Sequence, residues 1–220
     1  MSSPSGGVPR HWALWVVLLA AAGSYALTTG VRQSMGLFVS PLNTSTGLGL
    51  GSISLAFAFG QLWWGLTQPV AGAIADKVGA GRVLFVGLLM VALGTFITPY
   101  MTSTLGLILA IGVLAAGGAG LAGPSVLMPS ATRLIVPERR GIAFGVVNAG
   151  SSFGQFLIAP IAGMLMLSFG WASAMQVLAL GVLLSLPAAF ILSGTPAHGT
   201  AAAQPKILDH VWNALKPLLS

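Results

Sequence analysis

Two long uncharged stretches constrain this chain more than any other feature of its sequence. Residues 83–132 and residues 141–205 contain no Asp, Glu, Lys or Arg. Soluble domains carry about 25% charged residues, whereas charged residues make up 5% of this chain. Because one helical crossing of a bilayer takes about 20 apolar residues, each stretch is long enough for two crossings. The sequence therefore predicts an all-α membrane protein surrounded by membrane lipid.

Composition excludes several other classes of protein. A hydrophobic content of 55% excludes a disordered chain, and the absence of cysteine excludes a disulfide-stapled fold. The net charge of +6 comes from basic residues spread in ones and twos, which form no patch for nucleic acid. Without cysteine and without a cluster of carboxylates or histidines, the sequence predicts no metal site and no cofactor.

Apolar segments separated by Gly, Pro, Ser and Thr predict six membrane-spanning helices. Helices are expected because the backbone groups of a segment in lipid must be hydrogen-bonded within that segment. The six spans cover residues 12–39, 53–75, 83–97, 105–128, 142–167 and 172–192, with turns at 41–52, 98–104 and 168–170. The third span is short, and we expect it to extend to Tyr100.

Lys and Arg occupy alternate connections between these spans, while the three remaining loops carry no charge. Cytoplasmic loops are enriched in Lys and Arg. We therefore expect a multi-pass inner-membrane protein whose terminal segments, 1–11 and 193–220, both lie in the cytoplasm around a bundle of residues 12–192. The basic residues are Arg10 before the first span, Lys77 and Arg82 after the second, Arg133, Arg139 and Arg140 after the fourth, and Lys206 and Lys216 after the sixth.

Each end of the sequence has two interpretations. The start resembles a signal peptide, but its apolar run continues toward Val39, which favours an uncleaved first span. Near the other end, one helical face of residues 207–215 is apolar and fits either a short amphipathic helix on the membrane surface or a frayed tail. That face consists of Ile207, Leu208, Val211, Trp212 and Leu215.

Small residues recur along one face of three predicted spans. Helices in lipid pack through small residues that let their backbones approach, so we expect these faces to lie inside the bundle. In the second span the face consists of Gln61, Gly65, Gln68 and Gly72, in the fourth of Gly112, Ala116, Ala119 and Gly123, and in the fifth of Gly141, Gly145, Asn148, Ser152, Gln155, Ala159 and Ala162.

Polar side chains within the spans are the candidate substrate-binding residues. Gln61, Gln68, Asn148 and Gln155 are either such residues or partners in interhelical hydrogen bonds worth about 0.6 kcal/mol each. Arg32 is the only charged residue inside a span, and it lies about 30 Å along the first one. It either attracts an anionic substrate or has a structural role, with its charge reaching the outer interface.

Two glycine motifs resemble enzyme signatures. Gly118, Gly120 and Gly123 match a dinucleotide-binding pattern, but within a membrane span they predict close helix packing. The G-x-S-x-G pattern centred on Ser152 would need a base, and the three histidines lie outside the apolar core. We therefore expect no enzyme. The histidines are His11, His198 and His210.

The stretch GAIADKVGAGR resembles the signature between the second and third helices of the major facilitator superfamily. The matching residues are Gly72, Asp76, Lys77, Gly79 and Arg82, while Ala80 and Gly81 depart from it. GVRQSMGLFV in the first span and ERRGIAFGVVNAGSSFGQFLIAPIAG in the fifth resemble the monocarboxylate and oxalate:formate antiporter branch. The resemblance covers residues 25–192.

This resemblance implies two six-helix halves that rock against each other around a site near mid-membrane. The present sequence would be the N-terminal half, made of two inverted three-helix repeats, and would act with a second half or a homodimer partner. The implied substrate is a small organic anion such as a monocarboxylate. Gln33, next to Arg32, would occupy the place of a basic substrate-binding residue. The alternative is a truncated, inactive product or a membrane partner that does not transport.

The resemblance also implies that Asp76 and its basic neighbours close the cytoplasmic side; a tight basic turn is the simpler interpretation. Asp76, Glu138 and Asp209 all lie in predicted cytoplasmic segments. We therefore expect no membrane-buried carboxylate in this chain, and any proton coupling would use residues outside it.

Overall fold

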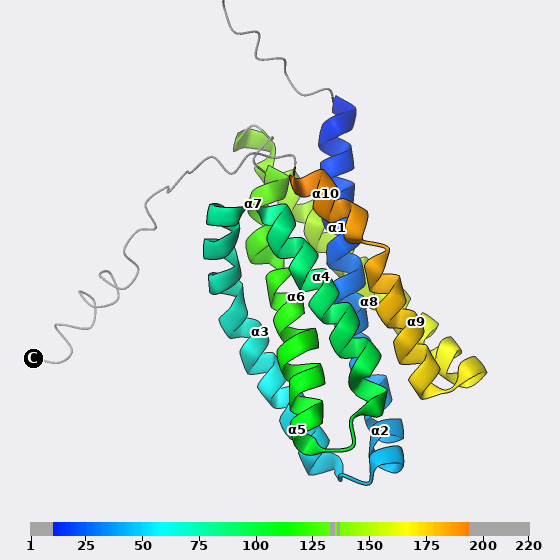
Figure 1. The fold of residues 1–220 in the computed structure, drawn as a ribbon. Helices are drawn as coiled ribbons and strands as arrows, with labels where there is room; N and C mark the ends of the chain where they lie inside the picture. Colours follow the sequence, from blue (N-terminus) through cyan, green and yellow to red (C-terminus); the bar gives the residue numbers. More distant parts are fainter. Residues whose placement is uncertain (1–10, 133–134, 136, 194–220) are drawn as a thin grey trace, which may run out of the picture.

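The computed structural model describes residues 11–132, 135 and 137–193, and every regular element within these ranges is helical (Figure 1). The predicted N-terminal segment up to residue 10 and the amphipathic face of residues 207–215 lie outside the described residues. The elements are α1 (His11–Ser34), a 3-10 turn (Met35–Phe38), α2 (Val39–Thr46), α3 (Leu50–Val78), α4 (Ala80–Ile97), a 3-10 turn (Thr98–Tyr100), α5 (Thr104–Leu107), a π-helical segment (Ile108–Ala116), α6 (Gly117–Leu121), α7 (Pro124–Thr132), a 3-10 turn (Pro137–Arg139), α8 (Arg140–Phe169), α9 (Trp171–Leu183) and α10 (Leu186–Ser193).

Four helical stretches are long and apolar enough to cross a membrane: Ala80–Tyr100, Thr104–Thr132, Arg140–Phe169 and Trp171–Leu192. The first of these confirms that the third predicted span reaches Tyr100. The two other long helices, α1 with 24 residues and α3 with 29, also exceed the length of about 20 residues that a crossing requires. The all-helical architecture is thus confirmed.

The turns are shorter than the sequence predicted. The turn expected over residues 41–52 is reduced to residues 47–49, because α2 continues through Pro41 to Thr46. Proline fits the first turn of a helix, where its missing N–H has no partner in any case. Gly47 and Gly49 then adopt φ of +65° and +83°, which glycine reaches without a Cβ penalty. The turn-forming residues therefore predicted the position of this turn correctly, but the predicted turn was too long.

Two predicted spans are interrupted. The fourth contains the π-helical segment and a turn at Ala122 and Gly123, after which Pro124 begins α7. The sixth breaks at Leu184 and Ser185, ahead of Pro187. Proline cannot donate the backbone hydrogen bond that would continue the preceding turn. The sequence contained the cause of each interruption, although the predicted spans ran through them.

The ends of the helices separate into two groups (Figure 1). The start of α1 and the ends of α3, α7 and α10 lie at one end of the bundle, and α2 and α5 lie at the other. Lys77 at the end of α3, Arg82 at the start of α4 and Arg140 at the start of α8 therefore share one end, which we call the basic end. The described chain begins and finishes at this same end.

The most extensive packing joins α1 to α8, and glycines bring the two backbones together. A Cβ on Gly150 would lie 2.6 Å from the carbonyl oxygen of Ala22, and a Cβ on Gly30 would lie 2.6 Å from that of Gly154. Real Cβ atoms do not come this close, so only glycine permits the approach. Gly150 and Gly154 belong to the apparent hydrolase motif, which here serves helix packing.

The stripe of small residues on the fourth span is buried, as predicted, and Gly118 contacts Gly87 of α4 at backbone distance. The predictions for the second and fifth spans were wrong for this bundle. In the second span Gln61 and Gly65 are exposed, and Gln68 and Gly72 are half-buried. The stripe of the fifth span is largely exposed, and its exposed residues include Asn148 and Ser152. The buried face of α8 is the adjacent one, because Gly150 and Gly154 provide the approach to α1. That buried face comprises Ala143, Val147, Ser151, Gly154, Ile158 and Ala162.

We expect Gly154→Ala to lower the melting temperature and Gly163→Ala to leave it unchanged or raise it slightly. Both glycines lie in α8, where alanine favours the helix by up to about 1 kcal/mol. A Cβ at 154 meets the backbone of Ala26 and would cost about 1–3 kcal/mol, whereas nothing lies within 4 Å of a Cβ at 163. Thermal unfolding of the detergent-purified variants measures the difference. Equal melting temperatures would contradict this packing.

Candidate functional site

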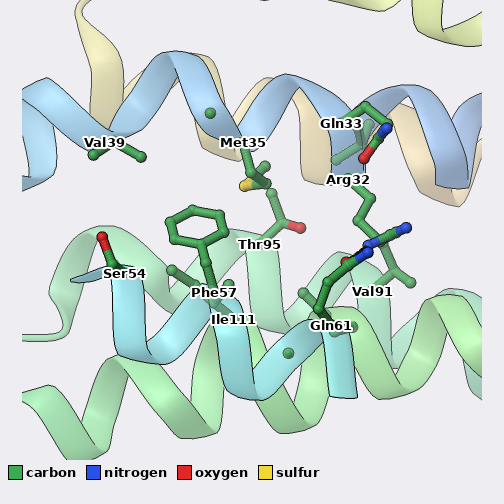
Figure 2. A pocket seen from close by; sticks show the side chains of 15 residues that line it. Arg32, Gln33, Met35, Val39, Ser54, Phe57, Gln61, Val91, Thr95 and Ile111 are labelled. Atoms are coloured by element: carbon green, nitrogen blue, oxygen red, sulfur yellow. Dashed lines mark hydrogen bonds between the residues drawn. The ribbon is translucent and has the colours of Figure 1, made fainter. Parts of the chain in front are cut away.

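Arg32 is half-buried on α1, and its side chain reaches across to α3. Its Nη1 donates a hydrogen bond to Oε1 of Gln61, and its Cζ lies 4.4 Å from the centroid of the Trp64 ring. A guanidinium this close to an indole face gains a favourable cation–π interaction. Figure 2 shows the side chain pointing from α1 toward Gln61. Both partners are neutral, so they hold the cation without cancelling its charge.

Gln33, the next residue, is directed toward α8. Its Nε2 lies 3.5 Å from Oε1 of Gln155, whose own Nε2 lies 3.3 Å from the hydroxyl oxygen of Ser151. Successive helical residues point about 100° apart, which explains how Arg32 and Gln33 contact different neighbouring helices. The structure therefore brings four of the six predicted binding residues together in one cluster, which we call the outer polar cluster: Arg32, Gln33, Gln61 and Gln155.

Gln68 and Asn148 lie apart from this cluster. Gln68 lies seven residues from Gln61 on α3, and Asn148 lies seven residues from Gln155 on α8. Each separation is about 10 Å along the helix. In both helices the displacement is toward the basic end. Within the described part of the chain neither side chain makes a hydrogen bond, and Asn148 is exposed. These two residues therefore lie closer to the basic end than the cluster does.

A cavity of about 400 Å³ adjoins Arg32 between α1, α3, α4 and the π-helical segment (Figure 2). Among the described residues, Arg32 is the only charged one that lines it. The walls are mainly apolar and include Met35, Phe57, Val91 and Ile111, with Gln33 and Gln61 at the polar side. The site thus combines one cation with a large apolar space.

Thr95 also lines this cavity. Its hydroxyl group is buried and, like that of Ser125, has no hydrogen-bond partner among the described residues. Most buried hydroxyls in helices bond to a carbonyl one turn back, as Thr98 does with Gly94 at 2.7 Å. Sequence reasoning missed Thr95 and Trp64. Trp64 follows Gln61 by three residues and so shares its helical face, a spacing that could have identified it; nothing in the sequence distinguishes Thr95.

The five residues of the predicted gating motif lie at or near the basic end, where α3 meets α4. A single residue, Gly79 with φ of +96°, connects the two helices, so the loop predicted over residues 76–82 is almost entirely helical. Asp76, Lys77 and Arg82 are exposed, and Nη1 of Arg82 lies 3.4 Å from the carbonyl oxygen of Val78. Gly72 faces Ser125 of α7. The structure describes a tight turn with exposed charges of both signs.

The described ranges contain no group of three His, Cys, Asp or Glu side chains close enough together to hold a metal ion. The outer polar cluster consists of a cation and amides. Such groups bind an anion by charge and hydrogen bonds.

Residues 10–219 match the family described as the Major Facilitator Superfamily. The chain belongs to this superfamily. It is 28% identical to monocarboxylate transporter 11 of Mus musculus, over 92% of this chain and 45% of that protein. It is also 28% identical to the oxalate:formate antiporter of Oxalobacter formigenes, over 91% of this chain and 47% of that protein. The superfamily and branch predicted from the motifs are thus confirmed.

The fold is similar to that of solved superfamily structures. A crystal structure of a mutant of the peptide transporter POT superposes with a TM-score of 0.68 at 20% identity, over 99% of this chain and 47% of that chain. The chain therefore spans about half the length of the relatives it matches. It is a multi-pass membrane protein of a family of transporters, not enzymes.

We expect Thr95→Val to raise the melting temperature and Thr98→Val to lower it. An unpaired buried hydroxyl costs about 1–3 kcal/mol, which valine at 95 removes at nearly constant shape. The same change at 98 removes a hydrogen bond worth about 1 kcal/mol. Thermal unfolding of the two purified variants compares two positions in the same helical stretch, Ala80–Tyr100. A lower melting temperature for Thr95→Val would show that its hydroxyl has a partner.

Proposed function

We propose that this chain is the N-terminal six-helix half of a secondary transporter that moves a small organic anion, of the monocarboxylate type, across the inner membrane. The observation that carries the proposal is Arg32, a half-buried cation with neutral partners beside a cavity. An uncompensated charge within a membrane bundle is costly and marks a functional site by default. The similarity to transporters named for monocarboxylates, oxalate and formate supports an anionic substrate.

In this proposal the two long helices α1 and α3 join the four apolar stretches to give six spans. The pairing of helices supports two inverted three-helix repeats. The first helix of each repeat packs against the second helix of the other repeat. Thus α1 packs against α8, and the segment from Ile108 to Leu121 packs against α3. The third helices, α4 and α9 with α10, pack against each other.

The exposed polar face of α8 supports a partner that covers it. In lipid, exposed Asn148 and Ser152 would lack hydrogen-bond partners, whereas a second six-helix half or a second copy of this chain would enclose them around an aqueous path. The coverage of about half of each relative agrees with this arrangement. Alternating access would then arise from rocking of the two halves.

The proposed roles follow from position. Arg32 attracts the anion, with Gln33, Gln61 and Gln155 as hydrogen-bonding neighbours, and Gln68 and Asn148 meet the anion on its way to the basic end. The motif Gly72, Asp76, Lys77, Gly79 and Arg82 closes the cytoplasmic side against the partner half. This assignment places the basic end, and therefore both termini, in the cytoplasm.

Uptake of labelled lactate, formate and oxalate into liposomes that contain the purified chain tests the transport proposal. We expect uptake of at least one acid and at least a tenfold loss in Arg32→Gln, because a charge-assisted hydrogen bond is worth about 1.5–3 kcal/mol. Arg140→Gln, at the basic end, is the matched control and should retain uptake. Absence of uptake for all three acids would instead favour an inactive product or a partner that does not transport.

Reporter fusions test the proposed topology independently of transport. A phosphatase that is active only in the periplasm should be inactive when fused after Ser220 and active when inserted at Leu48, between the glycines that connect α2 to α3. The physical reason is the basic end, which the positive-inside rule places in the cytoplasm. High activity at Ser220 would contradict the model of six spans with both termini inside.

A further inference from the structure

We infer that the groove between α4 and α10 at the basic end binds an anionic phospholipid. The phosphate of the headgroup contacts Arg82, and one acyl chain lies along the groove. This site shares no residue with the cavity beside Arg32, and the inference does not depend on transport.

The shape of the groove is the first argument. At the basic end α10 packs beside α4 (Figure 1), and the groove between them has a volume of about 340 Å³. Among the described residues that line it, Arg82 is the only charged one. Its apolar walls include Phe85 and Phe190, whose rings meet edge to face with centroids 6.0 Å apart. The groove thus combines one cation with an apolar surface, as a phosphate and its acyl chain require.

The exposed face of α4 is the second argument. The exposed residues of the stretch Ala80–Tyr100 recur at steps of three and four, so they form one stripe along the helix. Apart from Arg82 this stripe is uncharged, which suits contact with lipid tails. The stripe consists of Arg82, Val86, Leu89, Leu93, Phe96 and Tyr100.

The length of this apolar surface matches an acyl chain. A second apolar groove, of about 230 Å³, lies between α4 and α9 and begins at Leu89, one turn beyond Val86. Half of the hydrocarbon core of a bilayer is about 15 Å thick, which equals about ten residues of helix. Ten residues beyond Arg82 is Ala92, which lines this second groove. A chain of one leaflet would therefore run from the first groove into the second.

The charge at the end of the groove is the third argument. Arg82 is exposed, and its Nη1 lies 3.4 Å from the carbonyl oxygen of Val78. A guanidinium has five N–H donors, so it can keep this contact and still bind a phosphate with two hydrogen bonds.

The surroundings of Arg82 increase the positive charge. No side chain caps the N-terminus of α4, and the free N–H groups of its first turn carry a positive partial charge. The connection from α3 to α4 contains Lys77 and Arg82 against a single carboxylate, Asp76. Basic residues at the ends of membrane spans attract anionic lipids, so this end favours an anionic headgroup over a zwitterionic one.

Native mass spectrometry of the purified full chain with added phospholipids tests the inference. The probes are dioleoyl phosphatidylglycerol, which is anionic, and dioleoyl phosphatidylcholine, which is zwitterionic. We expect the chain to retain about fivefold more phosphatidylglycerol, because one basic residue near the membrane surface contributes about this factor. Glycerol 3-phosphate, which has the phosphate without the acyl chains, should not displace the lipid.

Two variants assign the binding to this groove. Arg82→Gln should reduce the retention of phosphatidylglycerol to that of phosphatidylcholine. Arg140→Gln removes one charge at the same end but outside the groove, so it should keep the preference. Val86→Phe should fill part of the groove and lower retention of phosphatidylglycerol about fourfold, the effect of one buried methylene group. Val177→Phe is its control, since Val177 lies on α9, is 45% exposed and lines neither groove.

The possible outcomes distinguish a lipid from other occupants. Equal retention of the two lipids, or an unchanged preference in Arg82→Gln, would overturn the inference and favour an uncharged lipid or a protein partner in the groove. Displacement by glycerol 3-phosphate, or no effect of Val86→Phe, would show phosphate binding without an acyl chain and would also overturn it. Melting temperatures check that the variants fold, which is expected because all four positions are exposed. None of these outcomes depends on transport, so failure here leaves the proposed function intact.

Discussion

The backbone contact between α1 and α8 determines where the polar groups of the candidate site lie. Gly30 and Gly154 meet at backbone distance, and Arg32, Gln33 and Gln155 follow within one turn of them. Helices in lipid have no hydrophobic force to draw them together, so this close approach depends on glycine at both positions. A side chain there would displace α1 from α8 and separate the two glutamines. The packing of the bundle and the geometry of its site therefore have one cause.

The charge of Arg32 is the second constraint. Gln61 and Trp64 provide a hydrogen bond and a cation–π contact, which orient the guanidinium and lower the cost of holding it in the bundle. A carboxylate partner would have stabilised it further but would also have neutralised it. Neutral partners leave the positive charge available to an anion, and this fits the notion of a binding residue better than that of a purely structural one.

Hydropathy and charge patterns predicted the helices, most of their boundaries and three residues of the outer polar cluster, and the family resemblance added Gln33. These patterns failed where the same type of residue serves two different contacts. On α8, small residues serve both the contact with α1 and the exposed polar face, and the sequence could not tell which face is buried. Thr95 and the cavity depend on how α1, α3 and α4 pair in space. No periodicity within one helix reveals such an arrangement.

The cavity and the exposed face of α8 have different consequences for transport. In the proposed transporter, a group that is bound only by this chain moves with it, so its binding energy is the same in both orientations of the two halves. A ligand shifts a conformational equilibrium only through a difference in affinity between the states. That difference must arise where the anion contacts groups that a partner half can reach. Gln33 is exposed and Gln155 partly so, and both lie beside Arg32 on the way to the polar stripe. In the proposed transporter the cavity beside Arg32 would therefore affect which anion binds, and the outer polar cluster would couple that binding to movement.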